Sequence, residues 1–238
     1  MKICITGSHS VGKTTLAKAI SHRLELPMIR EVAREVIKHA GFTSTTEYIQ
    51  NADKHTKQAI QEEIFIAQLK EENKLKESGF VADRSIFDPI AYSYVYGISE
   101  EAIYKMIGTA ITHALSVYDL LVYVPPMFGP VSDGFRDTSE DIRMAVDECL
   151  TRYVEAYHNL GGTVLLIDTQ TVEERVEQII SALKNIQISF RVDEEGQGAF
   201  KLSNEDEEFA RKNIRRGDVN EQTTLFDLGA GNKSSAAR

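Results

Sequence analysis

The feature that most constrains the fold is a nine-residue stretch near the start of the chain, Gly7-Ser8-His9-Ser10-Val11-Gly12-Lys13-Thr14-Thr15. It fits the pattern G-x-x-x-x-G-K-[ST] without a mismatch. An apolar, β-branched segment, residues 2–6, precedes it, and residues 16–24 follow it with apolar side chains at helical spacing. A loop between a strand and a helix presents backbone N–H groups and the positive end of the helix to an anion. The stretch therefore predicts a phosphate-binding loop, and the alternative is a glycine-rich turn that binds no ligand.

The individual residues of this loop predict a nucleoside triphosphate site. Gly7 and Gly12 allow the backbone to adopt positive φ and to approach a phosphate closely. Lys13 is expected to bridge the β- and γ-phosphates, and the Thr14 hydroxyl is expected to bind Mg²⁺. The predicted cofactors are ATP and Mg²⁺, and no catalytic role is assigned to His9. The expected nucleotide-binding residues are Gly7, Ser8, Ser10, Val11, Gly12, Lys13, Thr14 and Thr15.

Composition limits the class of protein. The chain has 238 residues, of which 42% are hydrophobic and 26% charged, and this suits one α/β domain with some additional length. The net charge of −9 argues against direct binding of nucleic acid. The two cysteines, Cys4 and Cys149, are predicted to be buried thiols, without a disulfide framework or a zinc-ligand spacing. No signal peptide or membrane-spanning run is visible, so we expect a cytoplasmic protein without a membrane partner.

The order of apolar segments indicates a parallel sheet. Five short strands alternate with amphipathic helices, which is typical of a parallel sheet with helices on both faces. We therefore predict an α/β P-loop NTPase domain over residues 1–184, with functional side chains at the carboxyl ends of the strands. The strands are expected at residues 2–6, 26–29, 80–82, 120–124 and 163–167, and the longer helices at residues 53–77, 99–117, 138–160 and 171–183.

The sequence changes character after residue 184. Residues 186–190 and 199–202 are interpreted as two strands of a β-hairpin, and residues 203–215 as a charged helix, which together form a small extension over residues 185–216. Residues 217–238 are polar, so they are predicted to be disordered.

Two neighbouring residues follow the third predicted strand. Asp83 occupies the place of a carboxylate that holds Mg²⁺ or accepts a proton from an attacking hydroxyl, and its alternative role is a helix cap. Arg84 is expected either to face the phosphates or the acceptor, or to form a surface ion pair with Asp88. Gln61, on the long helix that is expected to line the acceptor pocket, is a weaker candidate because polar residues on such helices usually face water.

Two further candidates come from other parts of the chain. Glu31 ends the second predicted strand, where a carboxylate can orient and deprotonate a hydroxyl, or can simply pair with Arg34 one helical turn later. Arg136 lies in a glycine-flanked segment after the fourth strand, and we predict that it closes over the γ-phosphate. The alternative for Arg136 is an exposed side chain on a mobile loop. The predicted catalytic set is therefore Lys13, Glu31, Asp83, Arg84 and Arg136.

These motifs, taken together, resemble a known family. Residues 7–15, 30–35, 83 and 133–136 resemble, in order and spacing, the kinase domain of NadR-type proteins and their AAA-like ATPase relatives over residues 1–183. This resemblance implies a P-loop kinase fold and ATP-dependent phosphorylation of nicotinamide riboside. Asp83-Arg84-Ser85 is also similar to the Asp/Glu-Arg-Ser triplet of deoxynucleoside kinases, and thymidylate kinases carry a similar Asp-Arg pair.

Three functional classes are consistent with these observations. The first is a kinase for a small nucleoside-like acceptor: nicotinamide riboside, a deoxynucleoside or a nucleoside monophosphate. The second is an AAA-like ATPase in which hydrolysis switches the conformation. The third is a nucleotide-binding module without catalysis.

A short peptide near the end of the chain suggests a protein partner. Residues 222–228 resemble the Gln-x-x-Leu-Phe peptide by which bacterial replication and repair proteins bind the sliding clamp. Leu225 and Phe226 are large apolar neighbours in a polar segment, so they can act as anchors in an apolar groove, while the Gln222 amide fixes the register. The alternative is that Leu225 and Phe226 pack onto the kinase domain.

Overall fold

A computed structural model of the chain describes residues 1–127 and 139–194, with side chains described up to residue 186. The chain divides into two compact units, Met1–Gln187 and Ile188–Arg238. The first unit holds the sheet and every described side chain.

The core of this unit is a five-stranded parallel sheet. The strands are β1 (Lys2–Thr6), β2 (Met28–Ile29), β3 (Phe80–Asp83), β4 (Leu120–Tyr123) and β5 (Val164–Leu166). Their order is β2-β3-β1-β4-β5, and each neighbouring pair runs parallel. The predicted α/β class and the five-stranded parallel sheet are thus confirmed. Because β1 lies at the centre, the loop that leaves its carboxyl end sits between those that leave β3 and β4.

Helices connect the strands. Their bounds are α1 (Lys13–Leu24), α2 (Val32–His39), α3 (Thr45–Asn51), α4 (Lys54–Leu75), α5 (Phe87–Val95), α6 (Glu100–Val117), α7 (Glu140–Asn159) and α8 (Val172–Glu194).

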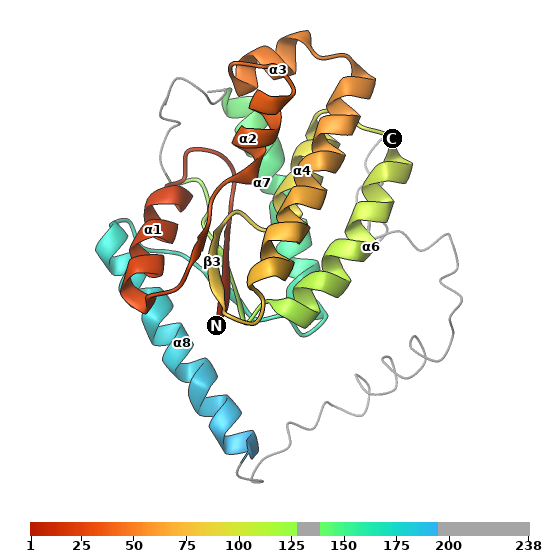
Figure 1. Cartoon of the computed structure of the whole chain (residues 1–238). Coiled ribbons are helices and arrows are strands. Elements are labelled where there is room, and N and C mark those ends of the chain that lie inside the picture. The colour runs from red at the N-terminus through yellow and green to blue at the C-terminus, as the bar shows by residue number, and fades with distance from the viewer. Residues whose placement is uncertain (128–138, 195–238) are drawn as a thin grey trace, which may run out of the picture. The chain divides into compact units, whose positions relative to one another are not determined.

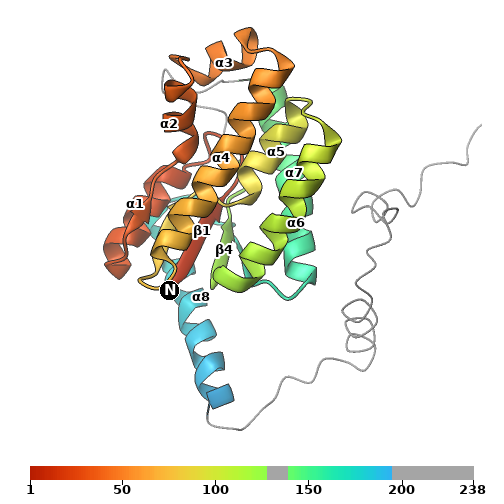
Figure 2. The ribbon, with the colours of Figure 1, turned by 45° about the vertical axis from the view of Figure 1, so that its right-hand side comes forward.

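The two faces of the sheet are covered by different helices. Successive side chains of a strand point to opposite faces, so Ile3 and Ile5 of β1 pack with α1 and α8, whereas Cys4 packs with α4, α5, α6 and α7. Figure 1 shows α1 and α8 on one side of the strands. Figure 2 shows α4, α5, α6 and α7 gathered on the other. Cys4 and Cys149 are both buried free thiols, as the sequence predicted.

A smaller apolar cluster lies beyond the edge of the sheet. It joins α2, α3 and α4 through Val36, Ile37, Tyr48, Ile60 and Ile64. Ser44 and Asp53 fix the starts of α3 and α4, since their side chains accept hydrogen bonds from the backbone N–H groups of Glu47 and Thr56. The same helix, α4, contributes Gln61, Ile64 and Gln68 to one wall of the candidate site.

The structure differs from the sequence interpretation in two places. Helix α5 occupies residues for which the sequence pattern predicted no element. Helix α8 continues to Glu194, so the prediction of a strand at residues 186–190 is wrong. The physical reason is that Ile179, Leu183 and Ile186 continue one helical stripe, and neither glycine nor proline occurs between residues 163 and 195 to end the helix. The second predicted strand, the helix at residues 203–215 and the final segment lie outside the described residues.

In the described part of the chain, no helix combines the length and the apolar character that crossing a bilayer requires.

Candidate active site

The loop between β1 and α1 has the geometry of an anion-binding loop. Gly12 has φ 91° and is the residue immediately before α1, and Gly7 has φ 148°. A Cβ atom on Gly7 would overlap the backbone carbonyl oxygen of Val124, so this position requires glycine for space as well as for conformation. Ser10 also has a positive φ, of 61°, which is uncommon for a residue with a side chain. The loop thus holds a strained backbone at the N-terminus of a helix, where phosphates bind.

Lys13 is the first residue of α1 and is buried against this loop. Its Nζ donates a hydrogen bond to the backbone oxygen of Ser8 at 2.6 Å. Burial, together with the nearby positive charge of Arg84, lowers the pKa of Lys13 to about 7. Bound phosphates would favour the charged form of Lys13, because opposite charges within a few ångströms stabilise each other.

Thr14 and Asp83 form the second part of the candidate nucleotide site. Thr14 Oγ1 donates to Asp83 Oδ2 at 2.6 Å, across the boundary between α1 and β3. Among the described residues, the other carboxylate oxygen of Asp83, Oδ1, is buried and has no hydrogen-bond partner. Hard oxygen ligands of this kind suit Mg²⁺. Thr14 and Asp83 therefore have the chemistry to hold a magnesium ion, which would neutralise charge at bound phosphates.

Arg84 lies between two carboxylates at the carboxyl end of β3. Its Nε and Nη2 are 2.7 and 2.6 Å from Oε1 of Glu31, and its Nη1 is 3.0 Å from Oδ1 of Asp88. Burial alone would lower the pKa of Arg84, but the negative charges of Glu31, Asp88 and Asp83 outweigh it and raise this pKa well above its ordinary value. Arg84 also has φ 103°, a backbone conformation that is strained for a residue with a side chain, and this conformation directs the side chain to its two carboxylate partners.

Asp88 fixes this arrangement from α5. Its Oδ2 accepts hydrogen bonds from Thr6 Oγ1 at 2.7 Å, from the Ser85 backbone N–H at 2.8 Å and from Ser85 Oγ at 2.9 Å. Glu31 is held from the other side, because its Oε2 accepts from Arg34 Nε at 2.9 Å. Since these contacts join β1, β3, α2 and α5, the ionic cluster is a rigid part of the fold.

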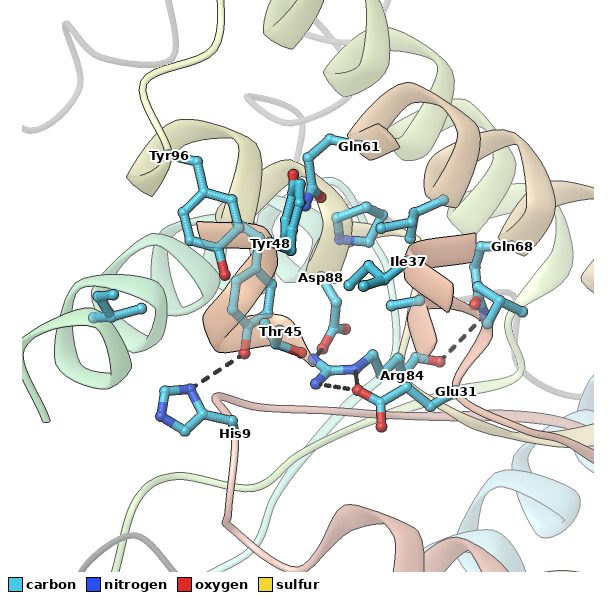
Figure 3. Close-up of a pocket in the computed structure, with 16 residues that line it drawn as sticks. His9, Glu31, Ile37, Thr45, Tyr48, Gln61, Gln68, Arg84, Asp88 and Tyr96 are labelled. Carbon is cyan, nitrogen blue, oxygen red and sulfur yellow. Dashed lines mark hydrogen bonds and ion pairs between the residues drawn. The ribbon is translucent and has the colours of Figure 1, made fainter. Parts of the chain in front are cut away.

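A pocket opens beside this cluster. The empty space beside the cluster amounts to about 640 Å³, a figure that includes the open solvent at the mouth of the pocket. Figure 3 shows Arg84, Glu31 and Asp88 at one end and Tyr48, Tyr96 and Gln61 at the other. The 16 lining residues come from the phosphate loop, from α2, α3, α4, α5 and α7, and from positions next to α2, β3 and α5: His9, Glu31, Val32, Ala33, Ile37, Thr45, Tyr48, Gln61, Ile64, Gln68, Arg84, Asp88, Pro89, Tyr92, Tyr96 and Ile142.

The structure brings most of the residues singled out in the sequence to this region. Lys13, Thr14 and Asp83 lie together at the phosphate loop, and Glu31 and Arg84 line the pocket. Arg84 does pair with Asp88, one of the alternatives, but the pair is buried at the pocket rather than on the surface. Gln61 also lines the pocket and is only 3% exposed. Arg136 lies outside the described residues.

Several pocket residues were not predicted from the sequence. Asp88, Tyr92 and Tyr96 follow one another at intervals of four residues, which places them on one face of α5 and of the capping residue that ends it. This spacing was a usable signal. His9 also lines the pocket, with Nδ1 3.4 Å from the Tyr92 hydroxyl. Nothing in the loop motif indicates where the side chain of His9 points.

Arg175 of α8 is a further residue that no sequence signal identified. Its Nη1 donates to the backbone oxygen of Val11 at 2.9 Å, and its Nε donates to the backbone oxygen of Thr169 at 3.0 Å. Burial lowers the pKa of this guanidinium. Arg175 therefore fastens the phosphate loop to the start of α8.

Comparison with known proteins identifies the family. A model described as an AAA domain matches residues 2–175, so the chain belongs to this AAA domain family. No curated protein matches the sequence.

Solved structures share the fold. Deoxyadenosine kinase from M. mycoides with bound dATP is 19% identical with a TM-score of 0.56, and the match covers 77% of this chain and 99% of that one. A NadR protein in complex with NR is 19% identical with a TM-score of 0.58, covering 74% of this chain and 50% of that one. Thymidylate kinase from Candida albicans is 14% identical with a TM-score of 0.54, covering 78% and 91%. The chain matches only half of the NadR protein, and at these identities the likeness shows a P-loop kinase-like fold.

Proposed function

We propose that this AAA-domain protein is an ATP-dependent kinase that transfers the γ-phosphoryl group to a small nucleoside-like acceptor. The observation that carries this proposal is the adjacency of two sites on one strand end. Asp83 bonds to Thr14 at the phosphate loop, while the next residue, Arg84, faces the pocket through its pair with Glu31. A triphosphate on the loop and a small molecule in the pocket would thus meet at consecutive residues.

The residues have distinct roles in this proposal. Lys13 and the backbone N–H groups of the loop neutralise the phosphates, and Thr14 and Asp83 hold Mg²⁺, which offsets charge at the transferred group. Glu31 is the favoured base, because it lines the pocket while Asp83 already bonds to Thr14. We further propose that Arg136 closes over the γ-phosphate.

The proposed reaction is a single displacement at the γ-phosphorus of ATP. The acceptor hydroxyl oxygen forms a bond to the γ-phosphorus, and the bond from that phosphorus to the β–γ bridging oxygen breaks, which releases ADP. The hydroxyl proton passes to the Glu31 carboxylate. Arg84 and Arg34 orient that carboxylate from two sides, so the protein contributes positioning and charge neutralisation.

The candidates for the acceptor are nicotinamide riboside, a deoxynucleoside and a nucleoside monophosphate. The folds shared with a deoxyadenosine kinase, a NadR protein and a thymidylate kinase support this range. The AAA domain match supports a second candidate, an ATPase that switches conformation. The pocket favours the kinase, because a hydrolytic switch needs no second small-molecule site.

Acceptor-dependent turnover tests the proposal. The full chain is incubated with ATP, Mg²⁺ and a panel of nucleosides and nucleotides, and ADP formation is followed. We expect ADP formation to depend on one class of acceptor and to disappear in Lys13→Ala, which removes the cation from the phosphates. ATP consumption at the same rate with and without every acceptor would favour the switch instead.

A further inference from the structure

The charges that line the pocket are already paired with one another. Among the lining residues that the structure describes, the basic side chains are Arg84 and His9, and the acidic side chains are Glu31 and Asp88. Resting on the proposed function, we infer that the acceptor is a nucleoside that carries no phosphate, and not a nucleoside monophosphate.

Arg84 is the residue that a phosphate would need, and each of its three guanidinium nitrogens already contacts a carboxylate. One edge binds Glu31 and the other binds Asp88. The ring of Tyr92 lies against the same group, with its centroid 5.2 Å from Arg84 Cζ. Arginine binds phosphate through the N–H groups that it also uses for carboxylates. A monophosphate would therefore have to compete with two carboxylates for this charge.

Neither carboxylate can easily move aside. Three hydrogen bonds from Thr6 and Ser85 hold Asp88, which is fully buried. Glu31 is bound by Arg34 as well as by Arg84. A phosphate placed here would lie beside two carboxylates without a free cation among the described lining residues, and burying such a charge is costly. A neutral hydroxyl has no such cost, because it can donate a hydrogen bond to Glu31.

The other end of the pocket suits an uncharged planar group. Tyr48 and Tyr96 pack edge to face at a centroid distance of 5.9 Å, and Tyr92 and Tyr96 lie 5.7 Å apart. Gln61 Nε2 donates to the Tyr48 hydroxyl at 3.2 Å, so the polar group at this end of the pocket is paired with an uncharged partner. Aromatic walls with an amide are typical of a site for a heterocyclic base. The pocket thus offers a base site at one end and a hydroxyl acceptor at the other.

Paired substrates test this inference. The full chain is assayed with MgATP and with deoxynucleosides or nicotinamide riboside, each compared with its own 5′-monophosphate. We expect kcat/KM for the nucleoside to exceed that for its monophosphate by at least roughly a hundredfold. Equal or preferred phosphorylation of a monophosphate would overturn the inference and leave the kinase proposal intact.

Binding measurements separate the inference from the proposed function. If no acceptor is phosphorylated, the kinase proposal fails, and calorimetry with the same pairs decides the inference by itself. Tighter binding of a nucleoside than of its monophosphate supports it. Equal or tighter binding of the monophosphate, or no binding of either, overturns it.

A charge-removing variant tests the physical reason. Glu31→Gln keeps the shape of the side chain but frees Arg84 of one negative partner, so monophosphate affinity should rise by roughly tenfold or more. Glu35→Gln is the matched control, since Glu35 is an exposed carboxylate on the same helix, and it should leave this affinity unchanged. Thermal unfolding establishes that both variants are folded. Unchanged monophosphate affinity in folded Glu31→Gln would overturn the inference.

Discussion

Lys13 carries its positive charge in a place where burial opposes it. Its pKa of about 7 reflects loss of hydration first and the charge of Arg84 second. The carboxylates Asp88, Asp83 and Glu31 act in the opposite direction but do not restore the ordinary value. At the residue scale, Lys13 is therefore only partly charged near pH 7, and a bound phosphate would favour its charged form.

This state predicts that ATP binding takes up a proton. Above pH 7 the free protein holds Lys13 largely uncharged, whereas triphosphate favours the charged form, so binding must bring a proton from solvent. ATP affinity should accordingly fall as pH rises above 7, by at most about tenfold per pH unit. Titration calorimetry at pH 8 in two buffers of different ionisation enthalpy measures the uptake. Lys13→Arg is the control, because its side chain stays charged over this pH range and should bind ATP without proton uptake. If the unchanged protein bound ATP without taking up a proton, this explanation would be contradicted.

Elements far apart in the chain hold the pocket together through one buried network. Glu72 of α4 is fully buried and accepts hydrogen bonds from Gln68 Nε2 at 2.7 Å and from the Tyr118 hydroxyl at 3.0 Å. It also lies 2.7 Å from His113 Nε2 of α6. The Tyr118 hydroxyl in turn accepts from the backbone N–H of Ile86, two residues after Arg84. This network therefore links α4 and α6 to the segment that carries Arg84 into the pocket.

Removing one hydroxyl tests that link. Tyr118→Phe leaves the buried N–H of Ile86 without its acceptor and takes a donor from Glu72, so the free energy of unfolding should fall by about 1–3 kcal/mol. Urea denaturation measures the change. Tyr104→Phe, at an exposed position of α6, is the matched control and should change stability by less than about 0.5 kcal/mol. Equal stability of the two variants would show that the network does not fasten the Arg84 segment.

The sequence predicted the parts of the site that are local and missed those that depend on distant contacts. Gly7, Lys13 and Thr14 lie within one stretch whose spacing alone fixes the loop geometry. The pocket instead joins Glu31, Gln61 and α5, which meet only after folding. Gln61 seemed a weak candidate because helix spacing cannot show that Tyr48 of α3 contacts it or that it is buried. The predicted strand at residues 186–190 failed because a short apolar run fits a helix equally well.

At the scale of the whole molecule, the P-loop unit and residues 217–238 are considered separately. The Gln222-x-x-Leu225-Phe226 peptide lies outside the described residues, and binding to a bacterial sliding clamp stays a prediction from the sequence alone. Its basis is a pair of apolar side chains in a polar segment. If it holds, it would place the proposed phosphorylation reaction beside a replication fork.

Clamp binding is tested with the full chain. Surface plasmon resonance on an immobilised bacterial clamp should detect binding that the double variant Leu225→Ala/Phe226→Ala loses, because both anchors are removed. ATP binding by the double variant provides the control for an intact P-loop unit. A Kd weaker than roughly 1 mM, or no difference between the two proteins, would rule the partner out.

The destination of the γ-phosphate distinguishes a kinase from a hydrolytic switch and tests the proposed function most directly. The full chain is incubated with Mg²⁺, ATP labelled in the γ-phosphate and the nucleoside panel, and the products are separated by chromatography. We expect label on a nucleoside, with one phosphorylated nucleoside formed for each ADP. Label found solely as inorganic phosphate, at a rate that no nucleoside changes, would contradict the kinase proposal.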